Sequence, residues 1–280
     1  MSKRVYEVYA LRYATHPSRR AFENFMFPDP HDKGPMPLDF FVWAIKGPDC
    51  VFVIDTGFDE ETAVRRQRTY LQSPIEMLQH IDIDAQDVTD VVITHMHYDH
   101  AGNMRAFPNA RFHIQQDEMA YCTGRCMGYE VLRRPFAARD VQVAINCLFE
   151  GRMVMHKGRS ELADGIVLQQ VGGHTKGLQV VAVRTARGQV VLASDAAHYW
   201  SNLRRRSPYP MMVDVDDMLD AYATVEALAD GPSHIIPGHD PKVLEVFPSL
   251  IGNHNIALLH FSPIASDGVN AKLFPVVGTG

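Results

Sequence analysis

Residues 91–103 of the chain read VVITHMHYDHAGN, a short apolar run that ends in a dense group of polar side chains. The β-branched residues at its start are typical of a buried strand. His95 and His97 are two positions apart, so an extended segment would direct both imidazoles to the same side. Asp99 and His100 follow directly. Four metal-ligating residues within the six positions 95–100 indicate a metal site at the end of a strand.

The ligand types in this group are imidazole nitrogen and carboxylate oxygen, without a thiolate. Such a set suits Zn²⁺, and it also suits iron, manganese or cobalt. Two imidazoles can share one ion while the neighbouring carboxylate and imidazole reach another. The pattern therefore predicts divalent cations as cofactors, with Zn²⁺ as the first choice.

Residues of the same kind follow other apolar runs. Asp55, His174, Asp195 and His239 each stand at or just beyond the end of a predicted strand. Scaffolds built from strands and helices place their binding and catalytic side chains in loops at the ends of strands. These loops are therefore the expected location of the site.

The hydrophobic patterning around these residues predicts strands and helices in one chain. Strands are expected at residues 4–12, 38–46, 50–55, 88–94, 110–115, 166–171, 178–184, 189–194 and 234–236. Helices are expected at residues 59–71, 74–80, 116–122, 138–149 and 216–229. The proline-containing stretch 16–36 is expected to be a long loop over the surface or over a site. Since no repeat or linker divides the sequence, a single domain over residues 1–280 is the simplest prediction.

The composition excludes several classes of protein. With 27 Lys and Arg against 33 Asp and Glu, the formal net charge of −6 argues against a nucleic-acid partner. A hydrophobic content of 46% can build a sizeable core and excludes intrinsic disorder as the main state. The apolar runs are far shorter than the roughly 18–20 residues that span a bilayer, so no membrane partner is expected. The N-terminus does not resemble a secretory signal and four cysteines are too few for a disulfide framework, which favours a cytoplasmic protein with free thiols.

The run from Thr94 to Asn103 resembles the His-x-His-x-Asp-His signature of the metallo-β-lactamase superfamily. Four more segments resemble motifs of that family, in the family's order: DTG at 55–57, GGHTKG at 172–177, SDA at 194–196 and PGHD at 237–240. The resemblance extends over roughly residues 38–245. It implies an α/β fold, classed as α+β in some schemes, in the form of the four-layer αβ/βα sandwich of that family.

The resemblance also implies that seven side chains hold two divalent metal ions, most simply Zn²⁺, in two sets joined by a bridging carboxylate. The first set is His95, His97 and His174, the second set is Asp99, His100 and His239, and the bridge is Asp195. Two cations that share a water lower its pKa and polarise a substrate carbonyl. Asp55 is expected behind them, where it would orient a ligand imidazole through its free ring nitrogen.

Within the superfamily, the chain is most similar to the quorum-quenching N-acyl homoserine lactonases. The similarity rests on residues 35–41 before a strand, residues 161–166 before the third histidine and residues 238–241 at the last one. It implies hydrolytic opening of a lactone, in which a metal-bridging hydroxide attacks the carbonyl and the ring alkoxide leaves. The implied partner is a small lactone or related ester, and a homodimer is a further hypothesis.

One position departs from the pattern of that branch. Its members often carry a tyrosine three residues after the bridging aspartate, and here that residue is His198, followed by Tyr199. Because imidazole can donate a hydrogen bond or a proton, His198 is predicted to be catalytic, together with Tyr199 and Asp99. The change suggests a substrate other than a standard acyl homoserine lactone. The run Arg204-Arg205-Arg206 would favour an anionic substrate if it faced the site.

The sequence leaves three other functions open. A thioesterase of the glyoxalase II type shares the metal motifs but needs a C-terminal helical domain, whereas only residues 240–280 follow His239. An iron-dependent persulfide dioxygenase uses one iron, which the full second ligand set argues against. A non-catalytic binding module would be expected to lack ligands, and none of the seven is missing.

Overall fold

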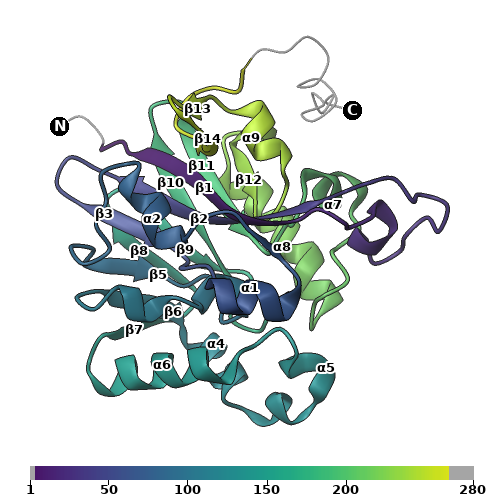
Figure 1. The fold of residues 1–280 in the computed structure, drawn as a ribbon, viewed down its shortest axis with the longest axis horizontal. Helices are drawn as coiled ribbons and strands as arrows, with labels where there is room; N and C mark the ends of the chain where they lie inside the picture. The colour runs from purple at the N-terminus through teal and green to yellow at the C-terminus, as the bar shows by residue number, and fades with distance from the viewer. Residues whose placement is uncertain (1–3, 265–280) are drawn as a thin grey trace.

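Two β-sheets, whose strands bury side chains on both faces, form the centre of the molecule. The computed structural model describes residues 4–264, and in it two β-sheets pack face to face with helices on their outer sides (Figure 1). The larger sheet has nine strands, in the order β13-β14-β1-β2-β3-β5-β6-β7 with β4 paired to β1. The second sheet has five strands, in the order β12-β11-β10-β9-β8. The predicted four-layer αβ/βα arrangement is therefore confirmed.

The strands of the larger sheet are β1 (Glu7–His16), β2 (Leu38–Lys46), β3 (Val51–Ile54), β4 (Thr69–Tyr70), β5 (Asp90–Val92), β6 (Arg111–Gln115), β7 (Met153–His156), β13 (Ser249–Leu250) and β14 (Asn253–Leu258). Those of the second sheet are β8 (Arg159–Ala163), β9 (Ile166–Gln170), β10 (Gln179–Thr185), β11 (Gly188–Ser194) and β12 (Ile235–Pro237). The α-helices are α1 (Glu60–Arg66), α2 (Pro74–Gln79), α3 (Tyr98–Ala101), α4 (Gln116–Cys122), α5 (Glu130–Arg133), α6 (Ala138–Phe149), α7 (Trp200–Arg205), α8 (Val215–Leu228) and α9 (Lys242–Val246). Short 3₁₀ helices cover Ala21–Asn24, Met104–Ala106, Arg125–Gly128 and Pro232–His234.

The two-residue period of the central strands separates the layers. In β1, Val8 and Ala10 belong to the apolar core between the sheets, while Leu11 belongs to the core beneath the helices α2 and α6. In β10, Val181 points into the core between the sheets and Val180 packs in the core shared with α8. Successive side chains of a strand point to opposite faces, so both faces of these two strands are covered and both strands are largely apolar.

Most predicted elements are confirmed to within a few residues, and the helix expected at 59–71 is too long. The helix α1 ends at Arg66 because Gln67 adopts a left-handed conformation with φ 56°. The chain then reverses, and Thr69–Tyr70 pairs with β1. The stretch 16–36 holds one short 3₁₀ helix and a bridge between Arg20 and Pro35.

Parallel pairing brings the polar strand ends together. The strands β3, β5 and β6 run parallel in the larger sheet, and β11 and β12 run parallel in the second. Asp55 follows β3 and His95 follows β5, while Asp195 follows β11 and His239 follows β12. Because the carboxyl ends of parallel strands meet at one edge, these four residues reach a common region between the two sheets.

The described part of the chain bears on membrane spanning and on the state of the cysteines. Among residues 4–264, no helix combines the length and the apolar character that a membrane crossing needs. The four cysteines are free thiols, as predicted.

Candidate metal centre

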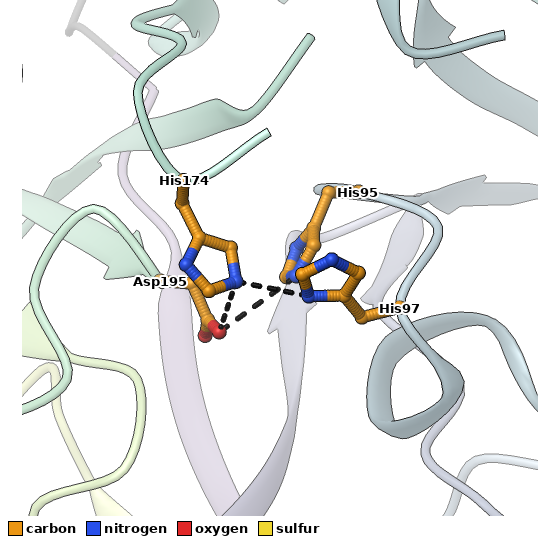
Figure 2. Close-up of side chains that lie close together, drawn as sticks. All are labelled: His95, His97, His174 and Asp195. Carbon is orange, nitrogen blue, oxygen red and sulfur yellow. Dashed lines mark hydrogen bonds and ion pairs between the residues drawn. The ribbon is translucent and has the colours of Figure 1, made fainter. Parts of the chain in front are cut away.

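The first predicted ligand set is brought together by three loops. His95 and His97 follow β5, His174 lies between β9 and β10, and Asp195 follows β11. One ligand atom from each of the four lies within 4.8 Å of the others, and all four residues are buried. Figure 2 shows the three rings and the carboxylate pointing toward one another. This is the convergence that a single ion site requires.

The second set meets on the other side of Asp195. Asp99, His100 and His239 also place one ligand atom each within 4.8 Å of one another. The Asp195 Oδ1 atom lies 2.9 Å from His239 Nε2 and 3.2 Å from His100 Nε2. Its Oδ2 atom lies 3.0 Å from His174 Nε2, in the first set. Each carboxylate oxygen therefore faces a different histidine set, as a carboxylate that bridges two ions would.

The donor atoms fit divalent cations. The Nε2 atoms of His95 and His100 are buried and have no hydrogen-bond partner among the described residues. The Nδ1 atom of His97 lies 2.9 Å from the Nε2 atom of His174. Burial and the neighbouring imidazoles hold the pKa of His95 and of His97 well below the usual range, so both rings are neutral. Neutral ring nitrogens that face one another in a buried space are suited to a shared cation.

Hydrogen bonds behind the ligands select the free ring nitrogens. His100 Nδ1 lies 2.7 Å from Asp55 Oδ2, which leaves Nε2 to face the site, as predicted for Asp55. Asp55 also accepts from the backbone N–H of Thr94 at 2.7 Å and from its hydroxyl at 2.8 Å. These bonds hold Asp55 at φ 61°, a conformation that non-glycine residues seldom adopt. His239 Nδ1 lies 2.7 Å from the carbonyl oxygen of Asp39, which leaves its Nε2 facing Asp195.

Glu118 is a positioning residue that the sequence patterns do not reveal. Its buried carboxylate accepts from the Met96 N–H at 2.8 Å, the Thr175 hydroxyl at 2.6 Å and the Gly177 N–H at 3.1 Å. Burial raises its pKa, and these hydrogen bonds oppose that shift. Met96 lies between two candidate ligands and Thr175 follows His174, so Glu118 ties two ligand loops to α4.

The candidate ligands open into a cavity of about 940 Å³. His97, Asp99, His174, Asp195 and His239 all contribute to its wall. Most of the rest of the wall comes from the long stretch before β2, the end of α1 and the turn after it, the region of α5, and the segment after α7. The cavity is large enough for a small-molecule ligand beside the metal-ligand candidates.

Of the two neighbours predicted to be catalytic, the structure brings only His198 to the cavity. The His198 Nε2 atom lies 3.2 Å from Asp195 Oδ2, and its ring stacks on Tyr209 with centroids 3.8 Å apart. Tyr199 does not line this cavity, because its ring packs in the core and its hydroxyl donates to the Pro37 carbonyl at 3.1 Å. Tyr209 does line it and was not predicted, since a tyrosine between two prolines has no motif context.

The arginine run after His198 does not face the cavity. Arg204, Arg205 and Arg206 are exposed, and none of them contributes to the cavity wall. The Arg206 guanidinium pairs with Glu226 at 2.8 Å, and the Arg205 guanidinium lies 4.4 Å from the ring centroid of Phe25. This run would favour an anionic substrate only if it faced the site, so it gives no support for one.

The chain is similar in sequence and in fold to known proteins. Residues 39–118 match the profile of the metallo-beta-lactamase superfamily. A probable metallo-hydrolase of Mycobacterium tuberculosis is 24% identical over 233 residues, which cover 73% of this chain and 72% of that protein. The N-acyl homoserine lactonase AiiB of Rhizobium rhizogenes is 30% identical over 130 residues, which cover 45% of this chain and 47% of the lactonase. The crystal structure of a quorum-quenching N-acyl homoserine lactone lactonase aligns with a TM-score of 0.70 at 18% identity, covering 86% of this chain and 95% of the lactonase.

Proposed function

Since this chain belongs to the metallo-beta-lactamase superfamily, we propose that it is a dinuclear metal-dependent hydrolase and that its reaction is the opening of a lactone ring. The observation that carries the proposal is the position of Asp195, whose two oxygens face separate histidine sets inside a cavity. The lactonase named among the relatives and the lactonase fold of the structural neighbour support the choice of a cyclic ester.

Two divalent cations, which we propose to be Zn²⁺, would be held by His95, His97 and His174 and by Asp99, His100 and His239, with Asp195 between them. When bound, such a pair supplies an acidified water and an electrophile for a carbonyl oxygen. The chain's own contribution is to fix the ring nitrogens that face the site. Asp55 and the Asp39 carbonyl do so by occupying the opposite ring nitrogens of His100 and His239.

His198 is the proposed substrate contact. Its ring borders the cavity, and stacking against Tyr209 fixes its plane. Burial lowers its pKa to about 3, although Asp195 opposes that shift, so the ring is neutral and can donate only one hydrogen bond. We propose that this hydrogen bond goes to an oxygen of the substrate.

Metal analysis combined with a panel of lactones, thioesters and persulfides tests the proposed function. We expect two metal ions per chain and ring opening of at least one lactone, with loss of both activity and metal after chelation. Release of thiol from thioesters alone would assign a thioesterase instead. One iron per chain with oxygen uptake on persulfides would assign an oxidoreductase, and either result would overturn the proposal.

Replacement of His198 by phenylalanine tests the substrate contact. Phenylalanine keeps the stacked ring and removes the hydrogen-bond donor, so we expect kcat to fall by about 10²-fold. Metal content should stay at the wild-type value, and the exposed His254→Phe variant serves as the matched control. An unchanged kcat would show that His198 does not contact the substrate. Loss of one metal ion would instead make His198 a ligand, for which its distance to Asp195 is short enough.

A further inference from the structure

The cavity next to the metal-ligand candidates is lined by positive charge, although the whole chain has a formal net charge of −6. Five arginines contribute to its wall: Arg19, Arg65, Arg66, Arg68 and Arg134. Among the described residues, the carboxylates in the wall are Asp99 and Asp195, which are both candidate metal ligands. The concentration of arginine is thus local to the site and does not follow from the composition.

Three of these arginines are half-buried and carry no ion pair. Among residues 4–264, Arg19, Arg66 and Arg68 lie within ion-pair distance of no carboxylate. Arg19 donates to the Asn24 side chain at 2.7 Å, and Arg66 donates to the Arg134 carbonyl at 2.9 Å. A partly desolvated cation without a counter-charge is unfavourable, so these guanidinium groups are suited to an anion from outside the chain.

Aromatic side chains hold these guanidinium groups close to the candidate ligands. The Arg19 guanidinium carbon lies 5.0 Å from the ring centroid of Tyr209, and that ring stacks on His198. The Arg66 guanidinium carbon lies 4.2 Å from the ring centroid of Tyr98, the residue before the candidate ligand Asp99. Cation–π contacts of this kind fix an arginine in place without neutralising it.

Arg68 also packs against an aromatic ring, and that ring neighbours a residue of the second ligand set. Its guanidinium carbon lies 5.9 Å from the ring centroid of Phe40, and the Phe40 and His239 ring centroids are 5.4 Å apart. Burial, together with the charges of Arg68 and Arg19, lowers the pKa of the nearby His16 to about 4. The two arginines therefore act on one part of the cavity wall, Arg19 from the stretch after β1 and Arg68 from the segment after α1.

We propose that this cavity binds a substrate with a carboxylate or phosphate group, which the arginines hold while the scissile carbonyl lies at the metal-ligand candidates. The proposal rests on the hydrolase function proposed above and names the chemical class of its substrate. The planar guanidinium fork matches carboxylate and phosphate oxygens with two parallel hydrogen bonds. An aromatic ring separates each of the three guanidinium groups from a candidate ligand or from His198. We therefore place the anionic group of the substrate on its side chain, beyond the lactone ring.

Matched substrates and single arginine variants test this assignment. The substrates are a lactone with a free carboxylate on its side chain, its methyl ester, and a phosphate analogue of the same length. We expect Arg66→Gln and Arg68→Gln each to lower kcat/KM for the anionic lactones by roughly 10-fold or more, mainly through KM, because a hydrogen bond between charged groups is lost. The methyl ester should be hydrolysed at the wild-type kcat/KM. The control is Arg206→Gln, which removes the same charge from the surface outside this cavity.

The dependence on salt is a second measurement that needs no variant. Raising the ionic strength should lower kcat/KM for the anionic lactones and leave the value for the methyl ester unchanged. Equal kcat/KM for the charged and neutral substrates, with no effect of either arginine variant, would overturn the anion site while the hydrolase function stands.

If no lactone is hydrolysed, the anion site can still be tested apart from the hydrolase function. The test is binding of an anion that has no bond to hydrolyse. Hexane-1-sulfonate is a suitable probe because sulfonates are weak metal ligands. Binding to the wild-type protein that is weakened at least 10-fold in Arg66→Gln and Arg68→Gln would retain the anion site. No binding to the wild-type protein would remove it.

Discussion

Replacement of Asp195 by asparagine is expected to reduce the bound metal to one ion per chain or fewer and to abolish hydrolysis. The imidazoles around Asp195 outweigh its burial and hold its pKa well below the usual range, so the residue is a carboxylate with one oxygen toward each histidine set. An amide has no negative charge and only one oxygen. Removing one partner of a buried pair of opposite charges costs about 3–5 kcal/mol. Since 1.4 kcal/mol is a factor of ten, metal affinity should fall by a factor of about 10² to 4 × 10³.

Metal content measured by elemental analysis, and affinity measured by competition with a chelator, check this expectation. The exposed Asp87→Asn variant makes the same chemical change in the loop before β5 and should bind metal like the wild-type protein. Two tightly bound ions and an unchanged rate in Asp195→Asn would show that the carboxylate does not bridge the two sets.

The sequence predicts the candidate ligands because each belongs to a local pattern that also has a structural cause. An apolar run such as residues 91–93 forms a buried strand, and the polar residues after it must leave the sheet at its carboxyl end. Parallel pairing of β3 with β5 and of β11 with β12 then places Asp55, His95, Asp195 and His239 at one edge. The same reasoning predicts no strand at β8, because the residues of β8 are half-buried or exposed and owe their strand conformation to pairing with β9.

Residues that act across the fold carry no such local signal. Glu118 lies in the first turn of α4, where an acidic side chain is expected simply to favour the helix dipole. Arg66 lies in the last turn of α1, where a basic side chain is equally ordinary, yet it lines the cavity. The arginine run 204–206 has the more conspicuous sequence and faces away from the cavity, because α7 ends there and directs it to the surface. That run would favour an anionic substrate only if it faced the site, and it does not.

Replacement of Gly177 by alanine is expected to destabilise the protein and to weaken metal binding together. A Cβ atom at this position would lie 2.1 Å from the backbone nitrogen of Glu118 and 2.5 Å from its Cα atom. Both contacts are to the backbone of α4, so no side-chain rotation can relieve them. Forcing such a contact costs about 3 kcal/mol, which differential scanning calorimetry would detect as a lower Tm. The movement would also stretch the hydrogen bonds of Glu118 to Met96 and Thr175.

Loss of such supporting bonds typically weakens metal binding about 10- to 100-fold, so chelator competition should detect the change in Gly177→Ala. Gly128→Ala is the matched control, because no heavy atom lies within 4 Å of the added methyl group. Should Gly177→Ala fail to fold, Glu118→Gln tests the same link with an unchanged backbone, since an amide cannot accept all three hydrogen bonds equally well. If either variant lost stability and kept wild-type metal affinity, Glu118 would support the fold without positioning the ligands, because the two ligand loops would then hold their geometry without it.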